Sequence, residues 1–237
     1  LPSEPESDMP VNNWYFMGPY GNLIPSTGAK WSGRITDIEP PVGSRTLRVA
    51  SESGGIWRMN FLPVPVSDNL NCMWIGSFCS HPTDDNTIFA GTGVPYKFNG
   101  IGLWKTNNLG VTWTQVALSP TPSAFHKVRY QPGNVNIMHI ASDNGYYRSI
   151  NGGTTWTRTL TGVVTDLTFK PGDANVIYAG RSNSTNGGGD GNGGIYKSTN
   201  NGVNWIKLTS SPLPITNVLD VRLSHTAAYP NIVCASI

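Results

Sequence analysis

An eight-residue pattern, Ser/Thr-x-Asn-x-Gly-x-x-Trp, occurs three times in this 237-residue chain and constrains its fold more than any other feature. Its tryptophans, Trp113, Trp156 and Trp205, are spaced 43 and 49 residues apart. Recurrence at such a period is typical of architectures built from one small supersecondary unit per repeat. The three copies of this octet are Thr106–Trp113, Ser149–Trp156 and Ser198–Trp205.

Three further segments recur with the octet. An alternating segment ends near a proline, as in Ile75–Pro82, and an apolar segment such as Thr87–Ala90 follows it after a turn. A Gly-apolar-aromatic-Lys/Arg segment then leads toward the octet, with copies at Gly55–Arg58, Gly102–Lys105, Gly145–Arg148 and Gly194–Lys197. Each unit therefore holds four short strands in about 45 residues, which is the signature of a β-propeller blade. No intervening segment has the apolar period of a helix.

The pattern predicts an all-β fold, a β-propeller of four-stranded antiparallel blades with about four and a half blades present. A seven-bladed ring needs about 315 residues at this period, so we expect the chain to be part of a seven-bladed or larger ring. The remainder of a longer chain is expected to complete it, and a separate chain is the alternative. The predicted blades are 31–66, 74–119, 125–161, 163–210 and 215–237, after a disordered or extended segment 1–13.

The octet is expected to stabilise the fold rather than to catalyse. Its Asn side chain is predicted to bond its own backbone two residues on, and its Gly to supply a positive φ angle. The Ser/Thr hydroxyl adds a local bond, and the Trp begins the outer strand and packs between blades, burying about 150–250 Å². The residues concerned are Asn108, Gly110, Trp113, Asn151, Gly153, Trp156, Asn200, Gly202 and Trp205.

These residues resemble the BNR or Asp-box repeats of sialidases, sortilin-like receptors, xyloglucanases and many secreted bacterial proteins. The family pattern has Asp where Asn108, Asn151 and Asn200 stand, so the turn chemistry is kept and a charge is lost. The resemblance covers residues 14–237. It implies a secreted or cell-surface protein and, in gliding and related bacteria, a substrate of the type IX secretion system. The superfamily hosts many activities, so the resemblance predicts the fold more narrowly than the function.

Composition and charge exclude some functions. The net charge is +2 and no basic cluster is present, so there is no electrostatic reason to expect nucleic acid as a partner. Apolar stretches fall far short of the roughly 20 residues of a membrane span. Cys72, Cys79 and Cys234 are expected to be buried free thiols, with a disulfide as the alternative.

Glu52 is the one candidate catalytic residue. Xyloglucanases carry a catalytic Asp in a Thr-Asp-x-Gly-Gly stretch of their first blade, which Ser51–Gly55 is similar to. Glycoside cleavage needs two carboxylates about 5–10 Å apart. The resemblance places the second carboxylate on a second propeller, outside this sequence. The alternative is that Glu52 is a solvated turn residue.

Candidate binding residues lie on a loop and on the inner strands. The loop between the second and third strands of the second blade carries aromatic rings that suit a sugar or a protein surface. Inner-strand arginines are predicted to face the channel, either as ligand-binding groups or as polar lining paired with Asp37, Asp166 and Asp220. The binding residues are Tyr96, Phe98, Asn99, Arg34, Arg129 and Arg222.

A glycine-rich loop offers Asp190 and Asn192 as a candidate calcium site, with a plain flexible loop as the alternative. No other cofactor is indicated. The sequence thus supports a non-enzymatic propeller that binds a glycan or another surface protein, or a scaffold module of a larger secreted protein. The alternative function is a xyloglucanase-type glycoside hydrolase that needs a second propeller.

Overall fold

The computed structural model describes residues 22–23, 30–31, 34–40, 46–59, 63–183, 191–209, 213 and 218–237. The ordered elements in these ranges are all β-strands, and no helix there is long and apolar enough to cross a membrane. The chain divides into two units, Leu1–Gly33 and Arg34–Ile237. In the first, β1 (Asn22–Leu23) and β2 (Lys30–Trp31) pair antiparallel. The predicted segment 1–13 lies outside the described residues.

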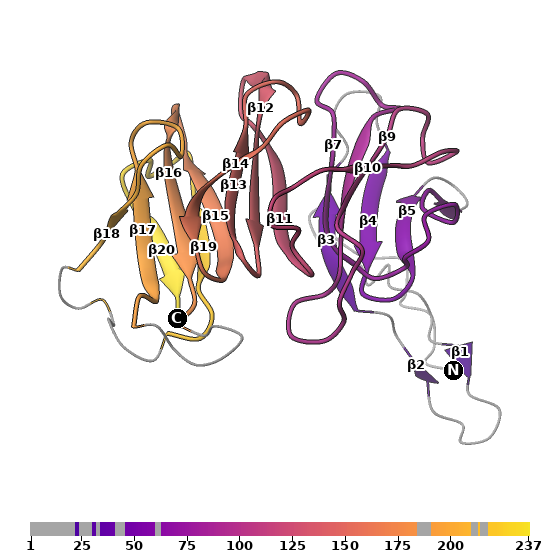
Figure 1. Cartoon of the computed structure of the whole chain (residues 1–237), viewed down its shortest axis with the longest axis horizontal. Helices are drawn as coiled ribbons and strands as arrows, with labels where there is room; N and C mark the ends of the chain where they lie inside the picture. Colours follow the sequence, from indigo (N-terminus) through magenta and orange to yellow (C-terminus); the bar gives the residue numbers. More distant parts are fainter. Residues whose placement is uncertain are drawn as a thin grey trace, which may run out of the picture. The chain divides into compact units, whose positions relative to one another are not determined.

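The described residues of the second unit form four antiparallel sheets of four strands and one pair of strands, which we call blades 1 to 5 (Figure 1). In each, consecutive strands are neighbours, which confirms the predicted blade-like sheets. Blade 1 is β3 (Ile35–Glu39), β4 (Leu47–Ser51), β5 (Gly55–Met59) and β6 (Pro63–Pro65); blade 2 is β7 (Ile75–Ser80), β8 (Ile88–Thr92), β9 (Leu103–Thr106) and β10 (Thr114–Val116); blade 3 is β11 (Phe125–Gln131), β12 (Asn134–Ser142), β13 (Gly145–Ser149) and β14 (Thr157–Thr161); blade 4 is β15 (Val164–Lys170), β16 (Asp173–Arg181), β17 (Gly194–Ser198) and β18 (Ile206–Lys207); blade 5 is β19 (Arg222–His225) and β20 (Val233–Ser236).

The apolar core lies between blades. The first strands of successive blades contact one another, from β3 through β7, β11 and β15 to β19. Between blades 2 and 3, one cluster joins Phe89 and Leu103 of blade 2 to Met138 and Ile140 of blade 3, and all four side chains are fully buried. Each sheet therefore buries its faces against its neighbours, as propeller blades do.

Each octet forms the turn between the third and fourth strands with one repeated set of bonds. In blade 2, the Thr106 hydroxyl accepts hydrogen bonds from the amides of Asn108 and Gly110, at 3.2 and 2.9 Å. The Asn108 side-chain oxygen accepts from the amide of Thr112, at 2.9 Å. The prediction that the Asn bonds the backbone two residues on was therefore wrong, because the hydroxyl occupies that amide and the Asn reaches four residues on.

Two consecutive left-handed residues produce this geometry. The octet glycines Gly110, Gly153 and Gly202 have φ of 84°, 81° and 74°, as predicted. The residue before each is also left-handed, as Leu109 and Asn201 show with φ of 53° and 60°. Two successive left-handed residues reverse the chain, so that the backbone amide four residues after the Asn points toward its side-chain oxygen.

The octet is also the contact with the preceding blade. The half-buried Trp113, Trp156 and Trp205 pack against clusters that include the preceding blade, as predicted. The ring of Trp205 meets that of Tyr146 edge-on, with 4.7 Å between centroids. A Cβ on Gly153 would lie 2.6 Å from Phe89 Cζ. Only glycine lets the turn approach the neighbouring sheet so closely.

Polar contacts join the inner strands. Asp37 of blade 1 forms a bidentate ion pair with Arg129 of blade 3, at 2.7 and 2.9 Å. The same carboxylate accepts hydrogen bonds from Ser77 Oγ and the Phe78 amide of blade 2. It thereby ties three blades together. Asp166 plays a similar part, since it pairs with Lys127 of blade 3 and accepts from an amide of blade 5.

The three cysteines are unpaired. Cys72 and Cys79 are buried, and burial raises the pKa of the Cys79 thiol well above its usual value. Cys234 is exposed, so its predicted burial was wrong. It lies on β20, which pairs with β19 among the described residues.

Paired glycine substitutions test the packing of the octet turn. Gly152 and Gly153 are both left-handed, but a Cβ on Gly152 meets nothing within 4 Å. We expect Gly152→Ala to lower the free energy of unfolding by about 1 kcal/mol, from backbone strain alone. Gly153→Ala adds overpacking against Phe89, for a total of about 2–4 kcal/mol. Urea denaturation followed by circular dichroism measures both losses, and equal losses would contradict the packing role.

Removing the Asp37 carboxylate tests whether this group holds the inner strands together. Asp37→Ala leaves the guanidinium of Arg129 unpaired among buried groups, so the free energy of unfolding should fall by about 3–5 kcal/mol. The matched control is Asp220→Ala, which breaks a pair with Arg222 whose side chains are about half exposed. That variant should lose no more than about 1 kcal/mol. Similar small losses of unfolding free energy in both variants, measured by the same denaturation, would contradict this role of Asp37.

Candidate functional site

A cavity of about 350 Å³ lies among the inner strands of blades 1, 2, 3 and 5. Residues from both ends of the second unit reach it, because the first strands of the blades converge there. The blade 2 loop between β8 and β9 forms part of its rim through Val94–Lys97. Its polar and aromatic lining consists of Arg34, Tyr96, Lys97, His126, Asp220 and Arg222.

Glu52 lies beside this cavity. Its Oε1 is 2.7 Å from Lys97 Nζ and 3.6 Å from Arg34 Nη1, and both cations line the cavity. The backbone amide of Glu52 also donates to the Arg34 carbonyl, at 2.8 Å. Its side chain is 14% exposed, so it is held in place rather than freely solvated. A carboxylate between two cations is suited to accept hydrogen bonds.

The three predicted arginines have different positions. Arg34 and Arg222 line the cavity, and Arg222 pairs with Asp220 at 3.0 Å. Arg129 is not among the lining residues, because its guanidinium is held by Asp37 and by the Phe78 carbonyl. Asp37 and Asp166 likewise serve the contacts between blades. The sequence could not separate these roles, since Arg129 and Arg222 lie on inner strands and Arg34 directly precedes one.

His126 is a polar group of the cavity that the sequence analysis missed. Neither of its ring nitrogens has a hydrogen-bond partner among the described residues. Burial, assisted by the charge of Arg222, lowers the pKa of His126 to about 3. The imidazole is therefore neutral at ordinary pH, with one N–H to donate and one nitrogen to accept. No spacing with another histidine marked it in the sequence.

Tyr96 and Phe98 sit on a tight loop between β8 and β9. Two backbone bonds between Val94 and Phe98, at 2.9 and 3.0 Å, close this loop. Tyr96 has φ of 64°, its side chain is among the most exposed aromatics, and its ring lies 5.8 Å from that of His126. Asn99 is exposed on the same loop. Of the three predicted loop residues, Tyr96 lines the cavity, whereas Phe98 and Asn99 follow it on the loop and are not among the lining residues.

Trp74 completes an exposed aromatic surface that the sequence analysis did not identify. Its ring stacks on Phe98 with 5.0 Å between centroids and 12° between planes. The two residues are 40% and 39% exposed. Trp74 precedes β7 and belongs to no octet, so only the folded loop shows that it joins Phe98. A stacked aromatic pair open to solvent is a flat apolar surface, and here Phe98 follows the cavity-lining residue Lys97 in the chain.

The candidate calcium site stays a prediction. Asp190 lies outside the described residues, and the Asn192 carbonyl accepts a hydrogen bond from the Tyr196 hydroxyl at 2.7 Å. Within the ranges that the structure describes, no three His, Cys, Asp or Glu side chains gather in a way that could hold a metal ion.

The curated proteins to which this chain is similar in sequence include xyloglucanases. No protein-family model matches it. A xyloglucanase of Acetivibrio thermocellus is 26% identical over 166 residues, which are 69% of this chain and 16% of that enzyme. A xyloglucanase of Paenibacillus sp. is 26% identical over 192 residues, or 77% of this chain and 15% of that enzyme. The chain thus spans about one sixth of the length of the curated relatives it matches.

Solved structures show the same relationship at the level of the fold. An ancestral GH74 enzyme has a TM-score of 0.59 and 23% identity over 81% of this chain and 25% of its own. The GH74 enzyme of Niastella koreensis has a TM-score of 0.59 and 20% identity, over 75% of this chain and 30% of its own. Together with the antiparallel four-stranded sheets, these matches show a partial β-propeller like those of GH74 structures.

Proposed function

We propose that this chain is part of a secreted or cell-surface β-propeller that binds a glycan at the rim of the inner cavity. The observation that carries the proposal is the exposed Trp74–Phe98 stack, in which Phe98 belongs to the loop that also bears Tyr96. Exposed aromatic rings that gather in one place, rather than singly, are typical of ligand-binding surfaces.

The chemistry of this region suits a sugar. One face of a pyranose ring carries mainly C–H groups, which pack on the flat face of an aromatic ring. Hydroxyl groups at the ring edge need donors and acceptors, and His126, Glu52 and Lys97 supply both kinds. Because His126 stays neutral, it can donate to one sugar hydroxyl and accept from another without a charged group on the ligand.

The comparisons support xyloglucan as the first glycan to test, since the curated relatives are xyloglucanases. A polysaccharide ligand would in turn place the protein outside the cell. The Asp-box assignment, the sortilin-like relationship and export by type IX secretion agree with that location and stay predictions.

Glycoside hydrolysis is the second candidate function. The similarity to xyloglucanases favours it, as does the position of Glu52 beside the cavity. Hydrolysis needs a second carboxylate across the scissile bond. That group would come from a part of the protein beyond these blades, which agrees with the small share of the relatives that the chain spans.

Aromatic truncation tests the binding proposal. Trp74→Ala and Tyr96→Ala should each weaken binding to xyloglucan oligosaccharides by about tenfold, which is about 1.4 kcal/mol of lost stacking and apolar contact. Titration calorimetry with a non-ionic xyloglucan fragment measures the change. Tyr229→Ala is the matched control, because Tyr229 is 64% exposed, against 66% for Tyr96, and lies in the β19–β20 turn. The proposed site would be refuted if Trp74→Ala and Tyr96→Ala bound as tightly as the parent protein, or if the parent protein did not bind.

Glu52→Gln separates the two functions. For a binding module, we expect the full-length protein to bind xyloglucan without releasing reducing ends, and the variant to bind with similar affinity. For a hydrolase, the parent releases reducing ends and Glu52→Gln abolishes that release while binding persists. A reducing-end assay beside the calorimetry distinguishes these outcomes.

A further inference from the structure

The inner strands of blades 1 to 4 each contain one extra residue that the neighbouring strand does not match. The pairing of the two strands slips by one position at this β-bulge. Bulges aim a side chain in a new direction and are common beside functional sites. The four bulge residues are Thr36, Gly76, His126 and Thr165.

Three of the bulge residues join their blade to the next one. The Thr36 hydroxyl donates to a backbone carbonyl of blade 2 at 2.7 Å. The Thr165 hydroxyl donates to the carbonyl of Val221, directly before β19, at 3.0 Å and accepts from the amide of the same residue at 3.1 Å. A Cβ on Gly76 would lie 2.1 Å from the Phe125 carbonyl oxygen of blade 3, so this glycine allows a close approach. In blades 1, 2 and 4 the bulge therefore serves the packing of blade on blade.

His126 departs from this pattern. Both of its ring nitrogens are buried, and neither has a hydrogen-bond partner among the described residues. The side chain lines the inner cavity together with groups of blades 1, 2 and 5. A buried donor or acceptor without a partner is costly to a fold. A repeat position that serves packing in three blades and leaves an unsatisfied imidazole in the fourth indicates a group that is kept for a ligand.

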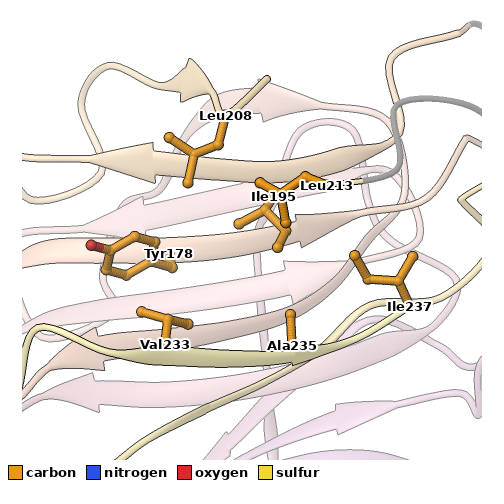
Figure 2. A pocket seen from close by; sticks show the side chains of 7 residues that line it. All are labelled: Tyr178, Ile195, Leu208, Leu213, Val233, Ala235 and Ile237. Carbon is orange, nitrogen blue, oxygen red and sulfur yellow. The ribbon is translucent and has the colours of Figure 1, made fainter. Parts of the chain in front are cut away.

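A second pocket lacks this chemistry. It has a volume of about 490 Å³ and lies beside blades 4 and 5 (Figure 2). Its lining residues are aliphatic apart from Tyr178, and none of them is charged. The inner cavity, in contrast, combines the imidazole of His126 with Arg34, Lys97 and Asp220. Hydrogen-bonding chemistry therefore directs a polar ligand to the inner cavity.

Tyr96 lies between the walls of the inner cavity. It belongs to the loop of blade 2, and its ring meets that of His126 of blade 3 edge-on, with 5.8 Å between centroids. Its hydroxyl donates to the Leu219 carbonyl, ahead of blade 5, at 3.4 Å, and the Ser182 side chain also hydrogen-bonds to this hydroxyl. Tyr96 is nonetheless 66% exposed. A ring that contacts a buried imidazole and is otherwise open to water has the geometry of a lid.

The ring of Tyr96 can move while its loop stays in place. Two backbone bonds between Val94 and Phe98, at 2.9 and 3.0 Å, keep the loop closed. The bond from the Tyr96 hydroxyl to Leu219 is at the long limit of hydrogen bonding, and exposed side chains change rotamer rapidly. Tyr96 also has φ of 64°, a left-handed backbone that is strained for a tyrosine. Such strain is concentrated at ligand clamps and switch regions.

We propose that Tyr96 is a gate over His126, and that its ring swings aside so that a ligand hydroxyl can bond to the imidazole. With the gate closed, both nitrogens of His126 are buried and unpartnered. With the gate open, the imidazole offers one donor and one acceptor. The identity of the ligand as a glycan rests on the proposed function. The gate itself does not, because it controls access to His126 in the free protein.

Acylation of histidines by diethylpyrocarbonate tests the gate without a ligand. The reagent acylates accessible neutral imidazoles, and the four histidines lie in different tryptic peptides, which mass spectrometry resolves. Tyr96→Gly removes the ring, and glycine suits the left-handed backbone at this position. A gate open no more than about 10% of the time limits the rate, so the variant should acylate His126 about tenfold faster or more. His139, which is fully buried between blades, should stay unreactive.

Tyr229→Gly is the matched control, because Tyr229 is 64% exposed and lies away from the cavity, in the β19–β20 turn. It should leave the acylation rate of His126 unchanged. If His139 also reacts in Tyr96→Gly, the variant has lost its fold, and Tyr96→Asn replaces it because Asn tolerates left-handed backbone. The proposal is overturned if a variant at Tyr96 that keeps His139 protected acylates His126 no faster than the parent protein.

A xyloglucan oligosaccharide then tests whether the gate leads to the ligand. At about ten times its Kd for Tyr96→Gly, the oligosaccharide should slow acylation of His126 about tenfold, since about one protein molecule in eleven stays free. Binding seen by calorimetry without protection of His126 would overturn the gate as a route for the glycan. Absence of binding would count against the proposed function alone, because the acylation rates of the free protein decide the gate.

Discussion

The contact between an octet turn and the preceding sheet is the interaction on which this fold depends. A four-stranded sheet of short strands cannot bury both faces alone, so each blade needs a neighbour. The octet meets that need with a glycine that allows close approach and a tryptophan that covers the exposed edge of the apolar cluster. The hydrogen bonds of Thr106, Ser149 and Ser198 fix the turn in one shape, with the same 2.9 Å bond to the octet glycine each time. Repetition of a single contact therefore builds the array of blades.

At the inner strands, polar groups join neighbouring blades, as the octet tryptophans do farther out. Asp37 joins three blades, and Asp166 joins blades 3, 4 and 5. These carboxylates are satisfied by partners from several strands, which makes their burial tolerable. The inner strands around the cavity are held in place by these contacts. Two of the lining side chains of the cavity, Tyr96 and Lys97, come from the loop between β8 and β9, where substitutions leave the strands unchanged.

Much of the fold was predictable because its signals are local. Positive φ at Gly153, the position of Trp156 at the start of an outer strand and the four-strand period all follow from residues close in sequence. The bonding of Asn108 was mispredicted, because the Thr106 hydroxyl takes the amide two residues on and the Asn108 side chain accepts from the amide four residues on. The exposure of Cys234 depends on which strands cover β20, and no local pattern reports that.

The sequence by itself determined the repeat, its strands and turns, and the aromatic loop of blade 2, because turn chemistry and apolar alternation act over a few residues. Only the tertiary structure decided which side chains meet. It paired Trp74 with Phe98, drew Arg129 to Asp37 rather than to the cavity, and placed Glu52 between Arg34 and Lys97. These contacts join separate strands and loops, and in the case of Arg129 separate blades. They depend on the packing of sheet against sheet, which sets distances that spacing along the chain does not contain.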